Sequence, residues 1–279
     1  PEIIKEILNH VSTLENAQEM WTQVDMYGLN PLMRVLANQK DPEIIKEILS
    51  QIDKLEHVTQ KEIWNQVNNG GWNLLMIALE FQKDPNIIKA ILSQISTVDP
   101  KIWTQVDKDG WNPLMIAFRS QKDPEIIKEI LNHVSTLENA QEMWTQVEKK
   151  ERKGWSPLMY ALEYQNDPEI FTEILSQIDK LEYRTQKEIW NTLPFPNERE
   201  SSWWIGSKRR FGDDVYVKLL TRRKLFEQKT LYLTPQEAVV ILNSDIDKSA
   251  IFTHASQKNK SLLIQQCNYA TIDLSSIIE

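Results

Sequence analysis

Cysteine, glycine and long apolar runs are all scarce in this 279-residue sequence. Its single cysteine, Cys267, cannot form an intrachain disulfide, and with only four scattered histidines we expect no structural zinc site. The seven glycines include no phosphate-binding loop, which excludes the Walker and dinucleotide-binding fingerprints. The apolar runs are too short for a membrane-spanning helix, and the first residues lack the pattern of a signal peptide. These absences count against several large enzyme classes and against an integral membrane protein.

The formal net charge of −8 is unevenly distributed along the chain. Residues 1–190 contain 20 basic and 30 acidic residues, whereas residues 191–279 contain 12 and 10. Hydrophobic residues make up 41% of the chain and charged residues 26%, which is typical of globular proteins. We therefore expect two regions that differ in chemistry.

A unit of about 41 residues recurs five times in the first 190 residues. Each unit begins with Pro-x-Ile, at Pro1, Pro42, Pro85, Pro124 and Pro168. Each also contains a tryptophan at one fixed place, namely Trp21, Trp64, Trp103, Trp144 and Trp190. Residues 1–24 and 124–147 are identical at all 24 positions. The array is therefore predicted to be a duplicated block of three units whose sixth member is lost or has diverged.

The local code of each unit is helical. Asn30, Asn112 and Ser156 are predicted helix N-caps because each precedes a proline that suits the first helical position. The same code begins a second helix after Asp41, Asp84, Asp123 and Asp167. A third helical stretch, such as residues 59–67, carries the repeated tryptophan. Because one unit cannot bury its apolar face alone, the units are predicted to stack into an all-α solenoid.

Residues 106–131, VDKDGWNPLMIAFRSQKDPEIIKEIL, resemble the ankyrin repeat. The residues in register with that family are Asp107, Gly110, Pro113, Leu114 and Ala117, with Asn112 in the usual threonine slot and Met115 in the usual histidine slot. The unit is longer than the family's because the tryptophan helix is added. The resemblance implies protein binding through the turns and the concave face. The degenerate, duplicated units also resemble effectors of intracellular bacteria, which implies secretion into the host cytoplasm and a host protein as partner.

The turn tryptophans are candidate partner-binding residues. Trp72, Trp111 and Trp155 each follow the turn glycine, so they either form a stacked structural ladder or anchor a partner at the turn tips. The five tryptophans at the other repeated place are predicted to be core residues.

The fourth turn is longer than the others by three residues. Residues 148–153, EKKERK, form either a solvated charged loop or a specificity loop that reaches a partner. Lys149 and Arg152 are the candidate partner-binding residues of this segment.

The repeat pattern ends after Trp190. We predict five repeats over residues 1–191, an irregular linker over 192–212 and a helical cap or adaptor module over 213–279. Trp203, Trp204, Arg209 and Arg210 are candidate binding residues, since basic and aromatic side chains together suit phosphate or nucleic acid. The alternatives are a solvated basic face or a complement to the acidic array. The sequence pI near 5.2 counts against nucleic acid as the main ligand.

No constellation of residues indicates catalysis. Cys267 and His254 are the single thiol and imidazole of the C-terminal region, and Cys267 is best interpreted as a buried hydrophobic residue. We predict no enzyme activity, catalytic residue, cofactor or metal, and a cytoplasmic protein-interaction scaffold. The alternative function is a targeting array fused to a small C-terminal enzymatic or phosphoinositide-binding module. An isolated C-terminal function over residues 191–279 would favour that alternative.

Overall fold

The computed structural model describes residues 6–7, 10, 16–193, 201–226, 235–243 and 260–265. The chain divides into two compact units, Pro1–Tyr160 and Ala161–Glu279, with the division inside helix α11 (Pro157–Tyr164). Within the described ranges no helix is both long enough and apolar enough to cross a membrane.

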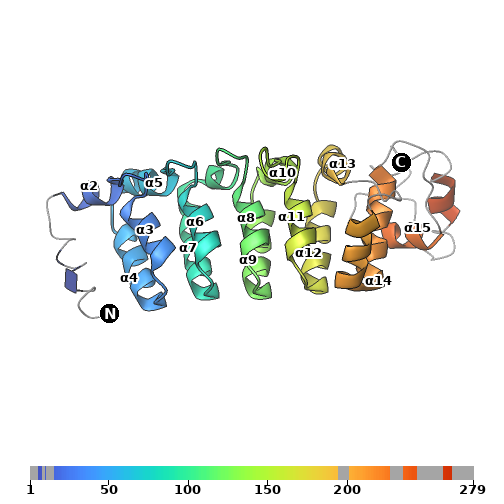
Figure 1. Ribbon diagram of the computed structural model, residues 1–279, viewed down its shortest axis with the longest axis horizontal. Helices are drawn as coiled ribbons and strands as arrows, with labels where there is room; N and C mark the ends of the chain where they lie inside the picture. Colours follow the sequence, from blue (N-terminus) through green and yellow to red (C-terminus); the bar gives the residue numbers. More distant parts are fainter. Residues whose placement is uncertain are drawn as a thin grey trace. The chain divides into compact units, whose positions relative to one another are not determined.

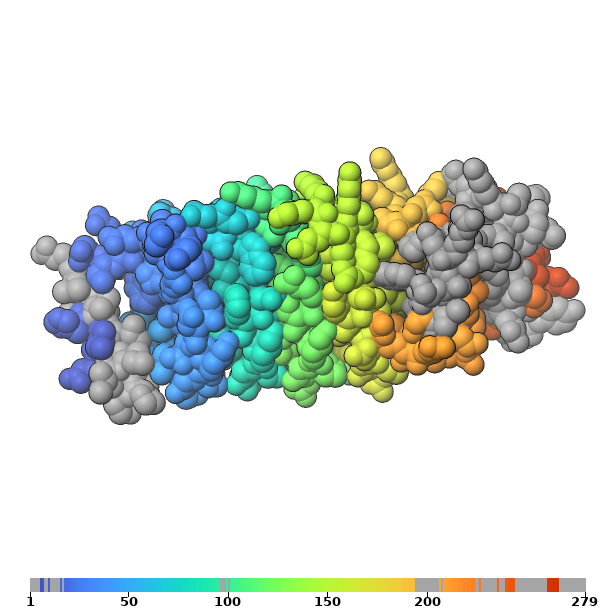
Figure 2. Space-filling model, in the orientation of Figure 1, coloured from blue at the N-terminus to red at the C-terminus, as the bar shows by residue number. Residues whose placement is uncertain are grey.

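In the first unit the repeats form successive pairs of antiparallel helices (Figure 1). The first helices are α3 (Pro31–Asn38), α6 (Leu74–Phe81) and α8 (Pro113–Ser120), and the second helices are α4 (Pro42–Asp53), α7 (Pro85–Val98) and α9 (Pro124–Ser135). Like helices pack side by side, α3 on α6 on α8 and α4 on α7 on α9. Figure 2 shows these repeats as colour bands, blue to green, in direct contact. The predicted all-α solenoid is confirmed.

A short third helical segment lies along one edge of these pairs (Figure 1). The segments are α2 (Ala17–Thr22), α5 (His57–Asn65), the 3₁₀ helix η1 (Pro100–Trp103) and α10 (Ala140–Thr145). The predicted stretch at residues 59–67 is therefore α5, two residues earlier. All five repeated tryptophans are buried, from Trp21 at 8% exposed to Trp103 and Trp190 at 0%, which confirms their prediction as core residues.

The predicted asparagine and aspartate N-caps form as their side-chain chemistry requires. The Oδ1 atoms of Asn30 and Asn112 accept the third backbone N–H of α3 and α8, at 2.8 and 2.9 Å. Asp41 accepts the backbone N–H of Glu43 at 3.0 Å, and Asp84, Asp123 and Asp167 do the same in their repeats. Proline occupies the first helical position after each of the four aspartates. These local signals fix where each helix begins.

The second unit contains α12 (Pro168–Asp179), α13 (Tyr183–Thr192), α14 (Ser201–Phe226) and α15 (Pro235–Leu242). The prediction of an irregular linker over 192–212 is wrong for residues 201–211, which are helical. They are held in place because Phe211 packs on Phe171, with ring centroids 4.5 Å apart, and because Arg210 is bonded to α11. At Gly212 the backbone leaves the helical conformation with φ of 83°, so α14 is two helices joined by a sharp corner.

Arg210 makes the same kind of hydrogen bond that joins neighbouring repeats in the first unit. In the first unit, the side-chain amides of Gln82 and Gln121 donate to the carbonyl oxygens of Leu36 and Leu79, each the sixth residue of the preceding first helix. The guanidinium of Arg210 donates to Leu162, the sixth residue of α11. Residues 201–226 thus form a helix pair that is bonded to the sixth residue of the preceding first helix, as the repeats of the first unit are.

Candidate functional site

The turn of each repeat in the first unit is closed by one side chain. Asp25, Asn68 and Asp107 each use Oδ1 to accept two backbone N–H groups of their own turn, at 2.8–3.0 Å. The turn glycine takes a positive φ, for example 88° at Gly110. A Cβ atom there would lie 2.8 Å from the carbonyl oxygen of Val147, so glycine is required for the close approach of the next turn as well.

Successive turns are joined by backbone hydrogen bonds. The N–H of Asn69 donates to the carbonyl of Tyr27 at 3.0 Å, that of Lys108 to Gly70 at 3.1 Å and that of Lys149 to Asp109 at 2.7 Å. The turn tips therefore form one continuous, rigid edge in the first unit.

Buried asparagines connect the repeats beneath this edge. The Nδ2 atoms of Asn30, Asn73 and Asn112 each donate to a carbonyl in the next third helix, at 2.8–3.0 Å, and to a glutamine side chain beside it. All three asparagines are fully buried. Each side chain therefore caps its own helix and also fixes the next repeat.

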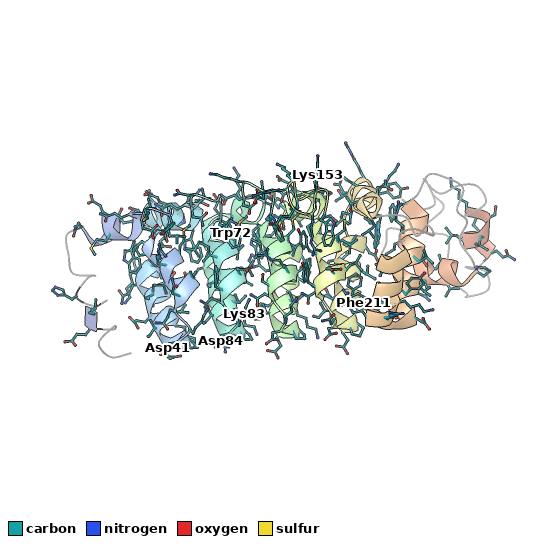
Figure 3. All side chains as sticks on the ribbon, viewed as in Figure 1. Asp41, Trp72, Lys83, Asp84, Lys153 and Phe211 are labelled. Carbon is teal, nitrogen blue, oxygen red and sulfur yellow. The ribbon has the colours of Figure 1, made fainter. Side chains whose placement is uncertain are left out.

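The turn tryptophans do not share one environment. Trp111 is only 7% exposed and packs on Tyr160 with ring centroids 4.4 Å apart, so little of its ring is accessible to a partner. Trp72 and Trp155 are half-buried. The indole N–H of Trp72 donates to Oδ2 of Asp107 at 2.8 Å, which fixes the orientation of the ring. Figure 3 places Trp72 near the edge of the third helices, away from Asp41, Lys83 and Asp84 at the opposite edge.

Arginines cover three of the turn aromatic rings. The guanidinium carbon of Arg34 lies 5.2 Å from the ring centroid of Tyr27, that of Arg119 lies 4.4 Å from Trp111 and that of Arg152 lies 4.1 Å from Trp155. Such cation–π contacts contribute on the order of 0.5–2 kcal/mol each. Arg119 also pairs with Glu80 of the preceding repeat at 2.8 Å.

The segment 148–153 is ordered around a buried carboxylate. Glu148 is fully buried and accepts the backbone N–H groups of Lys150 at 2.7 Å and of Arg152. The solvated-loop alternative is thus wrong for Glu148, because its charge is needed to satisfy backbone donors of the turn. Lys149 and Lys153 are exposed, and Lys153 lies at the edge of the third helices (Figure 3).

The basic residues of α14 are mostly engaged within the second unit. Lys208 pairs with Asp213 at 2.9 Å and Lys218 with Asp214 at 2.7 Å. Arg222, 4% exposed at its side chain, donates through Nε to Asp179 at 2.8 Å. Arg210 is half-buried against α11, whereas Arg209 is exposed. Trp203 and Trp204 belong to α14, and their side chains are outside the described set. Four of the basic side chains that the structure describes in α14, those of Lys208, Arg210, Lys218 and Arg222, are therefore engaged within the unit.

Sequence reasoning missed several exposed apolar side chains. Met26 is 80% exposed and Tyr27 57% exposed at the first turn, and Phe81 is 41% exposed at the end of α6. A comparison of the repeats could have identified them, because most residues at the equivalent positions of the other repeats are of a different type.

No group of three or more His, Cys, Asp or Glu side chains in the described ranges is arranged to hold a metal. Cys267 and His254 lie outside the described residues.

The comparisons with known proteins agree with the repeat architecture. The family model for ankyrin repeats, in three copies, matches residues 95–184. No curated protein matches the chain. Among solved structures the chain is similar to "Crystal Structure of PUF-8 in Complex with PBE-RNA", with 13% identity, 96% of this chain and 83% of that chain covered, and a TM-score of 0.35. A TM-score of 0.35 does not establish a common fold. The fold is an all-α solenoid in which residues 95–184 are similar to ankyrin repeats.

Proposed function

We propose that the chain binds a partner protein through the turn edge of its first unit, defined as the turns at residues 25–28, 68–71, 107–110 and 148–154 with the adjoining first helices. The observation that carries this proposal is where the internal identity stops. Residues 1–24 and 124–147 are identical, and the next positions, Asp25 and Glu148, begin turns that differ in length and charge. Divergence that begins at the turn and continues into the adjoining first helix, after 24 identical residues, is what selection for different contacts produces.

The physical state of the tips supports the same role. Their backbone groups are satisfied by the turn and by the neighbouring turn, so the exposed side chains are held on a rigid support. These side chains are apolar at Met26 and Tyr27, polar at Asn69 and basic at Lys108 and Lys149. A partner that matches this order would bind with a defined register.

Site-specific photo-crosslinking tests the proposal. A benzophenone amino acid is placed at Met26, Asn69, Lys108 or Lys149, all exposed at the tips, and the chain is irradiated in a cell lysate. Matched control positions are the exposed lysines of the second helices, Lys46, Lys89 and Lys128. We expect one polypeptide to be crosslinked from adjacent tip positions and not from the controls. Equal crosslinking from both sets, or crosslinking from the second-helix lysines alone, contradicts the proposal.

The finer proposal is that the chain is a secreted bacterial effector acting on a host protein in the host cytoplasm. It is supported by the duplicated, degenerate repeats and their resemblance to such effectors. A calmodulin-dependent adenylate cyclase fused to the chain tests it, because cyclic AMP then rises in host cells only if the fusion is translocated. An unchanged cyclic AMP level during infection by the source bacterium contradicts it.

The C-terminal helices at 213–226 and 235–242 are proposed to cap the array. The alternative of a phosphate-binding module is not favoured, because Arg222 and Lys218 are already paired with carboxylates.

A further inference from the structure

In the third repeat an arginine side chain already covers the ring of the turn tryptophan. Trp111 follows the turn glycine, and Arg119, eight residues later, is the seventh residue of α8. The guanidinium of Arg119 lies over the Trp111 ring at 4.4 Å and also pairs with Glu80. In this repeat the seventh residue of the first helix therefore faces the turn tryptophan.

The second repeat has the same tryptophan without the arginine. Trp72 follows the turn glycine, and Glu80 is the seventh residue of α6. Among the residues that the structure describes, no cation lies over the Trp72 ring, and the ring is half-buried where Trp111 is nearly covered. The second repeat thus has a glutamate at the helix position that holds the ring-covering arginine in the third repeat.

The Trp72 ring and the Glu80 carboxylate are both held in position, and the carboxylate can accept a further hydrogen bond. The hydrogen bond from Trp72 Nε1 to Asp107 holds the ring. The described contacts of Glu80, from Arg119 and from the Ser120 hydroxyl, both go to Oε2. The Oε1 atom of Glu80 therefore remains for another donor, and the side chain is 25% exposed.

We infer that Trp72 and Glu80 form a socket for an arginine side chain of the partner protein. A planar guanidinium can stack on the indole and donate to the carboxylate at the same time, which a lysine ammonium does less well. The adjacent Phe81, 41% exposed, offers an apolar surface for the methylene groups of that arginine. This inference rests on the proposed function and names the chemistry of one contact.

The test observes the Trp72 indole N–H by NMR in the full chain labelled with ¹⁵N-tryptophan. The probe is the peptide acetyl-Gly-Arg-Gly-amide, and the control is the same peptide with citrulline, which has the shape of arginine without its charge. The Trp72→Phe chain identifies the signal by its loss. We expect a saturable shift of the Trp72 signal with the arginine peptide in the millimolar range. The Glu80→Gln chain is expected to bind it at least about 5-fold more weakly.

A second variant tests the geometry without a ligand. In the Glu80→Arg chain the introduced guanidinium should lie over Trp72, as Arg119 lies over Trp111, so its own side chain closes the socket and the peptide no longer shifts the signal. The inference is overturned if the wild-type Trp72 signal is unmoved by the arginine peptide, or moves equally with citrulline. Crosslinks from the turn tips together with an unresponsive Trp72 would overturn the socket and leave the proposed function intact.

Discussion

The side-chain nitrogen of Asn112 lies 2.8 Å from the carbonyl oxygen of Met143, in the next third helix. The same side chain accepts the backbone N–H of Met115 at 2.9 Å. One buried amide thus caps its own helix and joins two segments that are 31 residues apart in sequence. The equivalent contacts of Asn30 and Asn73 make this the recurring polar connection of the array.

Two substitutions of Asn112 therefore separate the contribution of the helix cap from that of the hydrogen bond to the next repeat. Asn112→Ala should lower the free energy of unfolding by about 2–4 kcal/mol, since it removes the cap and leaves a buried carbonyl without its donor. Asn112→Ser retains a cap oxygen and should cost about 1 kcal/mol less. Urea unfolding followed by circular dichroism measures both. Equal losses for the two variants would mean that the cap oxygen contributes nothing and that the whole cost comes from the lost bond to Met143.

Two turn glycines with the same backbone conformation provide a matched pair. Gly154→Ala should cost about 1–2 kcal/mol, because its φ is 91° and a Cβ there meets nothing within 4 Å. Gly110→Ala should cost more, because its Cβ would also lie 2.8 Å from the carbonyl oxygen of Val147. Thermal unfolding of both variants checks the order, and a larger loss for Gly154→Ala would contradict it.

Stability should depend on pH through His133. Burial lowers the pKa of His133 below its usual 6.5, against the opposing charge of Glu129. Its imidazole stacks on Trp103, with centroids 5.4 Å apart. Because the unfolded chain binds this proton more tightly, the stabilisation is complete well above pH 6.5 and is lost as the pH falls through 6.5 toward the lowered folded pKa.

The His133→Gln variant should accordingly lose less stability than wild type between pH 7.5 and pH 5, measured by urea unfolding. His10 is the identical residue of the duplicated segment and is exposed, so His10→Gln is the matched control substitution. A parallel pH dependence for wild type and His133→Gln would show that His133 is not responsible.

The buried ion pair of the second unit should be sensitive to removal of one partner. Side chains of Arg222 and Asp179 are 4% and 1% exposed. Arg222→Met should cost about 3–5 kcal/mol, because it leaves the Asp179 carboxylate buried without its cation. The double variant Asp179→Leu with Arg222→Met should be more stable than the single variant. If denaturant unfolding finds the double variant less stable, the pair does not act as a unit.

The two turn tryptophans that differ in exposure should differ in their effect on stability. Trp111→Leu should cost about 2 kcal/mol or more, since its ring packs between Tyr160 and Arg119. Trp72→Leu should cost less than half of that because its ring is half-buried. Differential scanning calorimetry measures both, and equal losses would place Trp72 in the core.

The helices and the core could be predicted because their signals lie within one repeat. Asn112 and Pro113 show where α8 begins, and the apolar spacing shows which face of α4 is buried, from Ile44 to Ile52. The fate of Trp111 could not be predicted in this way. Its burial depends on Tyr160, which belongs to the following repeat.

The partners of the C-terminal basic residues could not be predicted from local sequence either. Glycines and prolines near residue 200 predicted a linker, and the run of lysines and arginines suggested an anion site. Arg210 instead bonds carbonyls of α11, and Arg222 is neutralised by Asp179, 43 residues away.

The sequence by itself determined the repeat, its helices and their caps, because capping and amphipathic periodicity are short-range chemistry read within a few turns of chain. Only the tertiary structure decided at which turn glycine a neighbouring turn approaches too closely for a Cβ atom. It also decided which turn tryptophan is buried and which arginines are paired with carboxylates. Those outcomes depend on side chains that meet across repeats about 40 residues apart, where packing and charge pairing, not local propensity, set the exposure of each group.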